Sequence, residues 1–511
     1  MAKKKVEKIV GFGELVAIAR RFKKNNKKVV YAHGTFDLLH AGHIYHLEEA
    51  RRLGDVLLVT VTPDRFIEKG FERPRFNEVE RARFVAGLEC VGYVSFTDAA
   101  DAKNAICEIQ PNIYVKGEDV RQKADEPESG LSQEIRVLKE VGGEVKFLKS
   151  LPIHSTALLN EFFGIYPKNV QEFLKTFREK YNFEKISKIL KEVRKLKVLV
   201  IGDAIIDAYQ FVEVMGKSEK SNNLTSRCLD EELYAGGVFA CANHIAGFCD
   251  NITLVTCLGD RESYEEFVGQ NLGKNVNPVF FRRPDAPTTL KRRFVEPAYN
   301  TKLFEAHHFD DSDLPEEITG QIKKYLLEKI DDYDVVLATD YGHGLLGYDL
   351  VDLICRRAKF VATNVQTNSA NRGFNLATKY WRADYVCVDE PEIRLATHSR
   401  AGDLRTLIRE VGRITKSHRI AITCGHKGCI VFNGEEFGEI PVLSTKVVDT
   451  VGAGDAFFSV SAPFAALNVP MELVGFAGNL AGALKVGTLG NKVPVSQKKF
   501  EEFASRLLTG R

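Results

Sequence analysis

Gly34-Thr-Phe-Asp-Leu-Leu-His-Ala-Gly-His43 is the stretch that decides how the first part of this chain folds. An apolar, strand-like run, Val29-Val-Tyr-Ala32, precedes it, and a helical apolar pattern follows it. A strand, a tight turn and a helix that opens at H-x-G-H are typical of a nucleoside triphosphate site. The amides at the helix N-terminus and the imidazoles of His40 and His43 can hold an α-phosphate while a sugar phosphate attacks it.

The length and composition of the chain indicate a globular protein with more than one domain. At 511 residues the chain is too long for a single core, and its 44% apolar and 27% charged residues are ordinary values. A net charge of +2 gives no electrostatic reason to expect nucleic acid as a partner. The ten cysteines form no metal-like pairs, and the most membrane-like stretch, residues 457–484, is interrupted by polar residues and a proline. We therefore expect a cytoplasmic enzyme that binds neither nucleic acid nor membrane.

Strands and helices alternate in two separate parts of the chain, which predicts two α/β domains. From residue 28 to about residue 163, continuous apolar strands alternate with helices, as in a parallel sheet that is covered on both faces. A second alternation opens with Lys197-Val-Leu-Val-Ile-Gly-Asp203, and a charged helical stretch lies between the two. We expect a first domain over residues 1–163, a helical linker over 164–183 and a second domain over 184–511, with ligands at the carboxyl ends of the strands.

Four histidines, His33, His40, His43 and His46, crowd the first motif, so a metal site must be weighed against a phosphate site. Zinc usually takes a closed tetrahedral set with further Cys, His or carboxylate ligands, and none recurs at a suitable spacing. The phosphate hypothesis also explains the glycines, Asp37 and the strand-turn-helix context. We expect His40 and His43 to be catalytic, and His46 to be a bystander one turn further along the helix.

A second motif, Asp449-Thr-Val-Gly-Ala-Gly-Asp455, lies near the other end of the chain. Its glycines let the backbone amides of Ala453, Gly454 and Asp455 converge on a developing anion at a helix N-terminus. Asp455 is placed to take the proton of a sugar hydroxyl that attacks the γ-phosphate of ATP. The motif predicts a sugar kinase site with Asp455 as its catalytic base.

The first domain resembles the HxGH nucleotidyltransferases, and in particular the adenylyltransferase domain of the bifunctional ADP-heptose synthases. The matching pieces extend beyond the motif and include Val115-Lys-Gly117 and Ser155-Thr156. The resemblance implies a Rossmann-like fold in which His40, His43 and Lys116 act on the triphosphate. It also implies nucleotide contacts at Gly34, Thr35, Phe36, Asp37, Ser155 and Thr156.

Two departures from that family leave the choice of nucleotide open. Thr35 stands where the family usually has Cys, and this gives a G-T-F-D form that also resembles glycerol-phosphate cytidylyltransferases. Ala157 stands in place of the second Thr of the family's S-T-T piece. ATP and CTP therefore both stay open as the nucleotide of the first domain.

The second domain resembles the ribokinase-like (PfkB) sugar kinases from about residue 183 to the end of the chain. The resemblance implies a three-layer α/β/α fold with a small β lid, and it implies ATP and Mg²⁺ as cofactors. The residues it assigns are substrate contacts at Asp203, Asp207, Gly236, Gly237, Lys291 and Asp340, nucleotide contacts at Thr423, Gly425, Gly428, Gly452, Ala453, Gly454 and Asn479, and a metal-associated Glu392.

The sugar-binding pieces depart from the pattern of the heptose kinases, whereas the glycine motif is intact. Ala240 replaces a sugar-binding Asn, and Asn364-Val-Gln-Thr367 stands where the family has D-P-K-G. An unusual polar run continues to Asn375, and Asp389 replaces the Asn of the metal-associated N-x-x-E piece. These differences predict a related but different sugar phosphate as substrate, and they place part of the substrate choice in residues 364–375.

The two domains together resemble the bifunctional ADP-heptose synthases with the domain order inverted, because that family places the kinase first. We expect a sugar-phosphate kinase and sugar-1-phosphate nucleotidyltransferase that makes an NDP-activated, heptose-like sugar for a surface polysaccharide. Its partners would be sugar phosphates and nucleoside triphosphates, and the lid would form a homodimer or a higher homo-oligomer. Two alternatives stay open: a cytidylyltransferase for a polyol or glycerol-type phosphate with a divergent kinase, and an active nucleotidyltransferase whose kinase-like domain only senses sugar or oligomerises.

Overall fold

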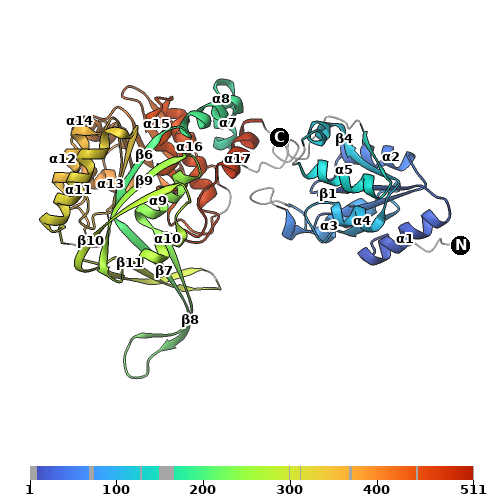
Figure 1. The fold of residues 1–511 in the computed structure, drawn as a ribbon, viewed down its shortest axis with the longest axis horizontal. Coiled ribbons are helices and arrows are strands. Elements are labelled where there is room, and N and C mark those ends of the chain that lie inside the picture. The colour runs from blue at the N-terminus through green and yellow to red at the C-terminus, as the bar shows by residue number, and fades with distance from the viewer. Residues whose placement is uncertain are drawn as a thin grey trace. The chain divides into compact units, whose positions relative to one another are not determined.

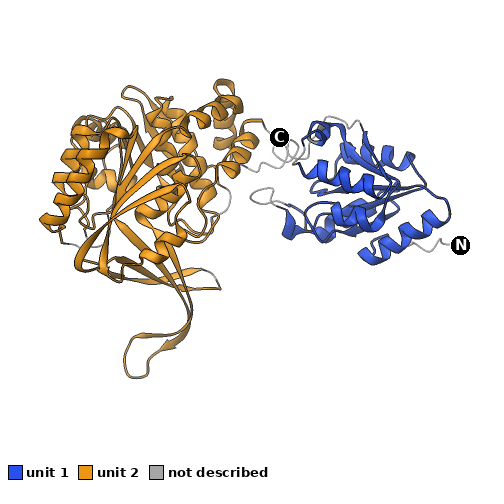
Figure 2. Ribbon diagram, viewed as in Figure 1, with its two compact units in different colours: residues 1–166, 510–511 blue, residues 167–509 orange. Residues whose placement is uncertain are grey.

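The structure is a computed structural model that describes residues 8–67, 74–126, 129–148, 166–298, 300–310, 312–367, 371–444 and 447–509. It contains two compact units, which Figure 2 shows in blue and orange. The first unit comprises residues 1–166 with 510–511, and the second comprises residues 167–509.

The first unit is built on a five-stranded sheet in which every pairing is parallel, in the order β3-β2-β1-β4-β5. The chain runs outward from β1 on one side and then on the other, so β1 and β4 flank a topological switch point, where ligands bind beside the carboxyl ends of the strands. The strands are β1 (Val29–Gly34), β2 (Val56–Val61), β3 (Tyr93–Phe96), β4 (Ile113–Gly117) and β5 (Glu144–Leu148).

Helices cover both faces of this sheet (Figure 1). Successive side chains of a strand point to opposite faces, and accordingly Val29 and Tyr31 pack with α1, α4 and α5, whereas Val30 and Ala32 pack with α2 and α3. The helices are α1 (Phe12–Lys24), α2 (Ala41–Arg52), α3 (Glu78–Ala86), α4 (Lys103–Ile109) and α5 (Gly130–Glu140).

The second unit is built on a nine-stranded sheet in the order β10-β9-β6-β13-β14-β15-β16-β17-β18. Its pairings are parallel as far as β16, and β17 and β18 add an antiparallel edge. The strands are β6 (Lys197–Gly202), β9 (Asn251–Arg261), β10 (Val276–Pro287), β13 (Val335–Asp340), β14 (Val361–Val365), β15 (Tyr385–Asp389), β16 (Ile420–Thr423), β17 (Cys429–Phe432) and β18 (Phe437–Ile440).

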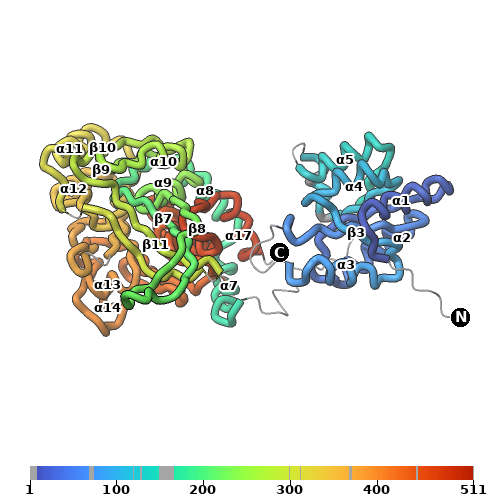
Figure 3. Tube along the Cα trace, turned by 90° about the horizontal axis from the view of Figure 1, so that it is seen from below, coloured from blue at the N-terminus to red at the C-terminus, as the bar shows by residue number. Residues whose placement is uncertain are grey.

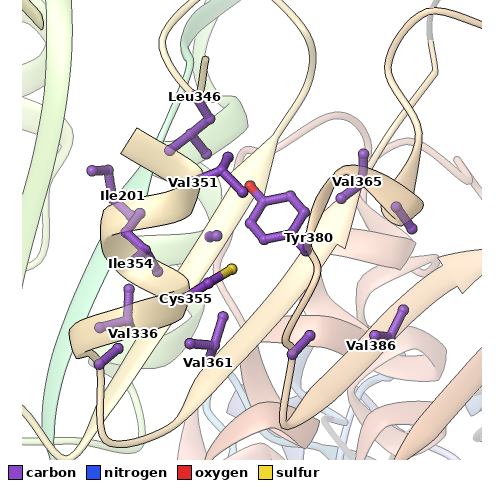
Figure 4. Packing of buried hydrophobic residues seen from close by; sticks show 14 of the residues in the cluster. Ile201, Val336, Leu346, Val351, Ile354, Cys355, Val361, Val365, Tyr380 and Val386 are labelled. Carbon is purple, nitrogen blue, oxygen red and sulfur yellow. The ribbon is translucent and has the colours of Figure 1, made fainter. Parts of the chain in front are cut away.

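Two layers of helices sandwich this second sheet. On one face, α11 to α14 share a large apolar core with the strands, and Figure 4 shows the part of it where Val351 and Ile354 of α12 meet Val336 and Val361 of the sheet. On the other face, α9 contacts β6 and β9, and α15 contacts β13, β14 and β15. The helices are α8 (Phe183–Val193), α9 (Gly237–Ala246), α10 (Glu265–Asn271), α11 (Glu316–Lys329), α12 (Tyr348–Arg357), α13 (Glu390–Ala396), α14 (Leu404–Ile414), α15 (Ala453–Ala466), α16 (Met471–Lys485) and α17 (Gln497–Thr509).

A separate four-stranded sheet, in the order β12-β11-β7-β8, forms the lid of the second unit. Its strands are β7 (Ala204–Lys217), β8 (Leu224–Gly236), β11 (Thr289–Glu296) and β12 (Thr301–His308). The long β7–β8 hairpin reaches beyond the rest of the unit (Figure 1), while Tyr209, Tyr234 and Val295 form a small apolar core in the lid. The predicted fold class, two α/β domains with a small β lid on the second, is confirmed.

The stretch that we predicted as a linker contains a packed helix of the second unit. The helix α7 (Lys168–Lys180) buries one face, where the ring of Phe177 stacks on Phe476 of α16 at 4.4 Å between centroids. Next to it, Arg178 Nε donates a hydrogen bond to the carbonyl of Leu507 in α17 at 2.7 Å. Figure 3 shows α7 close to α17. The apolar spacing that the sequence displays thus serves packing and not a free connector.

No helix in the described part of the chain combines the length and the apolar character that crossing a membrane requires.

We expect Phe177→Ala to lower the free energy of unfolding of the second unit by about 3 kcal/mol, because it leaves a cavity under a fully buried ring. Denaturant unfolding of the full chain, followed by a probe in each unit, measures this. The matched control is Phe173→Ala on the same helix, where the side chain is only half-buried. Equal effects of the two substitutions would contradict the packing described for α7.

Candidate functional site

The first motif places two imidazoles at the N-terminus of α2. His40 is the N-cap residue, and its Nδ1 accepts a hydrogen bond from the amide of Gly42 at 3.1 Å. The rings of His40 and His43 lie 4.0 Å apart between centroids, and the ring of Phe36 lies 5.4 Å from that of His43. Phe36 has a positive φ of 51°, so the backbone turns sharply just before the helix. The predicted catalytic pair is therefore brought together at a helix end that can bind an anion.

A fully buried arginine holds the turn that carries Thr35. The guanidinium of Arg81 on α3 donates to the carbonyl of Thr35 and, at 2.8 Å, to the carbonyl of Thr62. It also forms an ion pair of 2.5 Å with Asp64. The sequence analysis gave Arg81 no role, although a charged residue on the apolar face of a predicted helix is the signal that could have found it.

Asp37 also supports the turn, and it does so from inside the protein. Its side chain is buried, and its Oδ1 accepts a hydrogen bond from the amide of Arg75 at 2.6 Å. Gly34 ends β1 under the ring of Phe36, and a Cβ at Gly34 would lie 3.2 Å from that ring. These residues shape the loop, which fits contact with the nucleotide mainly through the backbone.

Lys116 lies at the carboxyl end of β4, beside β1, and is held there by a buried carboxylate. Its Nζ forms an ion pair of 3.1 Å with Glu134 of α5, and Glu134 also accepts from the hydroxyl of Tyr114 at 3.0 Å. Burial, together with the charge of Lys116, lowers the pKa of His33 to about 4. Lys116 is thus close to the strand end that carries the motif, and its partner Glu134 is a residue that sequence reasoning missed. Ser155 and Thr156 lie outside the described residues.

The second motif opens the helix α15 at the wall of a cavity of about 370 Å³. Gly452, the N-cap residue, has a φ of 77°, a left-handed conformation that favours glycine. Asp455 lies in the first turn, and its Oδ1 accepts hydrogen bonds from the hydroxyl of Tyr341 and from the amide of Gln366, both at 2.9 Å. Burial raises the pKa of Asp455 to about 6. A carboxylate with this pKa can act as a general base near neutral pH.

The lid contributes charged side chains to the same cavity. Asp207 and Lys291 occupy paired positions of β7 and β11, and both line the cavity. Asp207 forms an ion pair of 2.5 Å with Arg293 and accepts from the amide of Asn491 at 3.2 Å. Burial lowers the pKa of Lys291. A polar substrate in this cavity would contact both acidic and basic side chains.

The two glycines between β8 and α9 allow a close approach at this cavity. A Cβ at Gly236 would lie 2.2 Å from Oδ2 of Asp207, and Gly237, with a φ of 52°, lines the cavity itself. A larger residue at position 236 would displace Asp207, and one at position 237 would collide with the carbonyl of Asp203 and with Ile205. The predicted site residues Asp207, Gly237, Lys291, Gly452, Gly454, Thr423 and Glu392 all line this cavity together with Asp455.

The comparisons with known proteins agree with this geometry. A model of the pfkB family of carbohydrate kinases matches residues 195–498, more than half of the chain. The chain belongs to the pfkB carbohydrate kinase family. A second model, described as cytidylyltransferase-like, matches residues 31–187. The nucleotidyltransferase-like part thus precedes the pfkB part, which confirms the predicted order.

Curated relatives match over part of their length. The bifunctional protein HldE of Geotalea uraniireducens is 36% identical over 156 residues, which are 30% of this chain and 30% of that protein. The HldE of Streptomyces coelicolor is 42% identical over 146 residues, 28% of this chain and 30% of that protein. The match therefore covers less than a third of the length of each of these relatives.

A solved structure shows the fold of the pfkB part. Phosphofructokinase-2 of Escherichia coli, in complex with substrates and products, has a TM-score of 0.50 at 15% identity. The match covers 61% of this chain and 99% of that protein, so it extends over nearly the whole of the solved enzyme.

Two predicted substrate contacts in the pfkB part, Asp203 and Asp340, are also internal anchors. Asp203 accepts hydrogen bonds from the amides of Tyr341, His343 and Leu345 at 2.9 to 3.2 Å. Burial, with the nearby carboxylate of Asp340, raises the pKa of Asp203 to about 6. Both oxygens of Asp203 thus serve the loop after β13, and its role as a substrate contact stays a prediction.

Asp340 is the second of these anchors. Its Oδ2 forms an ion pair of 2.6 Å with Lys379 and accepts from the hydroxyl of Tyr380 at 2.9 Å. Its Oδ1 accepts from the amide of Asn375 at 3.0 Å. The side chain is 1% exposed, so Asp340 acts as an anchor in this structure, and a contact with substrate stays a prediction.

On the nucleotide side, Asn479 is likewise used by the backbone. Its side-chain amide donates to the carbonyls of Ile440 and Pro441 at 3.3 and 2.9 Å, and the contact with adenine stays a prediction. Gly428 has a φ of 97°, and a Cβ there would lie 2.0 Å from the carbonyl of Ile440. Gly425, with a φ of 55°, makes the same β16–β17 turn. The turn that follows Thr423 is therefore specified by backbone geometry.

The polar run from Asn364 to Asn375 also serves the backbone more than the substrate. Asn371 donates to the carbonyls of Tyr341 and Gly342 at 3.1 and 3.0 Å. Asn375 donates to the carbonyl of Gln366 at 3.1 Å. Residues 368–370 lie outside the described residues. Within the described part of the run, Asn364, Gln366 and Thr367 line the cavity, and only these can choose a substrate directly.

Oxygen ligands at the far wall of the cavity fit a hydrated divalent cation. Glu392 and Asp389 hold each other in a capping box at the start of α13, through bonds of 2.7 and 2.8 Å to each other's amides. Burial raises the pKa of Glu392 to about 8. Among the described residues, the buried Oδ1 of Asn364 has no hydrogen-bond partner, and no three His, Cys, Asp or Glu side chains form a cluster. This set suits contacts through water better than direct coordination.

We expect Asp203→Asn to destabilise the second unit by about 2 kcal/mol, because an amide nitrogen would face backbone N–H donors that now bind a carboxylate. Hydrogen exchange of the full chain should show faster exchange at the amides of Tyr341, His343 and Leu345. Asp250→Asn, at a side chain that is 61% exposed, is the control. Unchanged exchange together with a weaker affinity for sugar would indicate that Asp203 is a substrate contact.

Proposed function

We propose that the chain is a bifunctional transferase. In this proposal the second unit phosphorylates a sugar phosphate with ATP, and the first unit joins a sugar 1-phosphate to a nucleotide and releases pyrophosphate. The product would be an NDP-activated, heptose-like sugar for a surface polysaccharide. The observation that carries the proposal is that each unit has its reacting side chains at a helix N-terminus: His40 and His43 at α2, and Asp455 at α15.

The kinase reaction follows from the surroundings of Asp455. Its carboxylate takes the proton of a sugar hydroxyl as the hydroxyl oxygen attacks the γ-phosphorus of ATP. The backbone amides of Ala453 and Gly454 stabilise the charge on the phosphate in transfer. Mg²⁺, held near Glu392 and Asn364 through water, would neutralise charge on the triphosphate when it is bound.

The nucleotidyl transfer follows from the geometry at α2. The imidazoles of His40 and His43 and the first amides of α2 stabilise the α-phosphate as it gains a fifth oxygen. The sugar phosphate oxygen forms the new bond to the α-phosphorus, and pyrophosphate leaves. Lys116, fixed by Glu134, adds positive charge at the neighbouring strand end.

ATP is the nucleotide that we propose for the first unit, because the resemblance to the adenylyltransferase domain extends over most of it. One observation favours CTP as a second candidate. Thr35 gives the motif the form that also occurs in glycerol-phosphate cytidylyltransferases. In that case the acceptor would be a polyol or glycerol-type phosphate.

A heptose-like substrate, different from the usual heptose 7-phosphate, is our proposal for the kinase. Ala240 is buried on α9 and offers no hydrogen-bonding group where heptose kinases have Asn. A site that lacks one partner of a substrate hydroxyl binds that substrate poorly.

We also propose that the lid forms a homodimer. Five large apolar side chains of the lid are 39% to 63% exposed: Val214, Met215, Leu224, Leu229 and Phe304. Several exposed apolar side chains on one small sheet can mark a protein interface.

Light scattering at micromolar concentration should therefore give at least twice the chain mass of 57.2 kDa. We expect the double substitution of Met215 and Leu224 by Lys to yield monomers, since charges would be buried in the interface. A wild-type chain that is monomeric in this measurement would contradict the proposal.

The two activities should be separable in the full chain. His43→Ala should reduce pyrophosphate release by about a hundredfold or more, because a donor to the transition state is lost, and should leave ADP formation unchanged. Asp455→Asn should have the reverse effect, with ATP binding retained. If Asp455→Asn left ADP formation at the wild-type rate, the assignment of Asp455 as the base would fall. A wild-type chain that forms no ADP with any sugar phosphate would instead make the second unit a sensing or oligomerising module.

A further inference from the structure

Two side chains from neighbouring strand ends donate to the same oxygen of Asp455. Tyr341 follows β13, and its hydroxyl lies 2.9 Å from Oδ1. Gln366 follows β14, and its side-chain amide also lies 2.9 Å from Oδ1. In the part of the chain that the structure describes, no group donates to Oδ2. The carboxylate is therefore held by one oxygen, while the other has no protein donor.

The backbone of each donor is itself fixed by hydrogen bonds to further polar residues. The amide of Tyr341 donates to Asp203 at 2.9 Å, and its carbonyl accepts from Asn371 at 3.1 Å. The backbone amide of Gln366 donates to the backbone carbonyl of Asp340 at 2.8 Å. The backbone carbonyl of Gln366 accepts from the side-chain amide of Asn375 at 3.1 Å. These hydrogen bonds fix the backbone of both donors, and both donors meet at Oδ1 of Asp455.

We propose that Tyr341 and Gln366 are positioning residues that hold Oδ1 of Asp455, so that Oδ2 receives the proton of the attacking hydroxyl. This inference rests on the proposed kinase function. In the reaction, the O–H bond of the sugar breaks and its proton goes to Oδ2. The hydroxyl oxygen bonds to the γ-phosphorus, and the bond from that phosphorus to the leaving ADP oxygen breaks.

The residue at position 366 also affects the ionisation of the base, Asp455. Heptose kinases, which the chain resembles, have Lys where this chain has Gln366. A neutral amide stabilises the ionised carboxylate by one hydrogen bond, whereas an ammonium would add a full positive charge. The chain therefore holds its base with less positive charge than the family pattern would supply.

Other titratable groups face Asp455 from every side of the cavity. They are Asp207 of β7, Lys291 of β11, Lys485 of α16 and Cys241 of α9. Burial raises the pKa of Asp455, Asp207 adds to that rise, and Tyr341, Gln366 and Lys291 oppose it. Substitutions at 341 and 366 leave the charges of Asp207, Lys291 and Lys485 in place, so a change in titration can be assigned to the two donors.

The test is the pH dependence of kcat for ADP formation by the full chain. Tyr341→Phe and Gln366→Met each remove one donor at nearly constant shape, so the acidic limb should move to higher pH by roughly one unit. Gln366→Lys should move it to lower pH. KM for the sugar phosphate is measured in parallel, because Tyr341 and Gln366 both line the cavity; a change confined to KM, without a shift of the acidic limb, would indicate a substrate contact and overturn the positioning role.

Tyr380→Phe is the matched control. It removes an equally buried hydroxyl that donates to a carboxylate, Asp340, at 2.9 Å. This variant should lose stability without moving the acidic limb. A shift as large as that of Tyr341→Phe would show that general loosening, and not the contact with Asp455, sets the pH profile, and would overturn the proposal.

A second readout does not need kinase activity. Infrared titration of the full chain with isotope-labelled aspartate, minus the spectrum of Asp455→Asn, follows protonation of Asp455 directly. The expected order of midpoints is Gln366→Lys, wild type, then Tyr341→Phe and Gln366→Met. Identical midpoints in wild type and in both donor-deleting variants would overturn the positioning role. A wild-type chain that phosphorylates no sugar phosphate would instead overturn the proposed function, while the infrared order still decides the role of the donors.

Discussion

Negative charge that develops on a phosphate is stabilised at the N-terminus of a helix, and the arrangement of both units depends on that interaction. The first amides of a helix have no partner within the helix and carry part of its dipole, so they bind anions. A parallel sheet directs such helix ends to the carboxyl edge of its strands. In the first unit this brings His40 and His43 to α2, and in the second it brings Asp455 to α15.

Buried carboxylates keep these helix ends and their loops in place. Asp203 binds three amides of the loop after β13, and Asp340 binds Lys379 and Tyr380 beside it. Glu134 fixes Lys116 in the first unit. A buried carboxylate that lost its donors would cost several kcal/mol, so each anchor strongly selects one loop conformation. These charges therefore fix the geometry of the loops around the two sites.

The sequence predicts the two folds well because their signals are local. Glycine motifs, helix starts and apolar strands each occupy a few adjacent residues, and the cavity around Asp455 contains most of the residues that the motifs name. For Asp203, Asp340 and Asn479 the structure shows hydrogen-bond partners that the motifs do not reveal. Their partners are distant in sequence, such as Lys379 for Asp340, and an acidic residue after a strand looks the same whether it binds a ligand or a loop.

The residues that sequence reasoning missed are also long-range partners. Arg81 contacts the carbonyls of Thr35 and Thr62, and Gln366 contacts Asp455, 89 positions away. Only the folded structure pairs such residues. The helix α7 is a different case, because its apolar spacing is visible in the sequence, but the surface that it covers, near Phe476, is not.

The most direct test of two enzymes in one chain is a product profile of the wild-type protein. The full chain would be incubated with ATP or CTP and with a panel of sugar phosphates, sugar 1-phosphates and glycerol-type phosphates, and ADP and pyrophosphate would be quantified separately. The account predicts ADP from ATP with a heptose-like sugar phosphate, and pyrophosphate from ATP with a sugar 1-phosphate. Pyrophosphate only from CTP with a glycerol-type phosphate, without any ADP formed from the sugar phosphates, would contradict it.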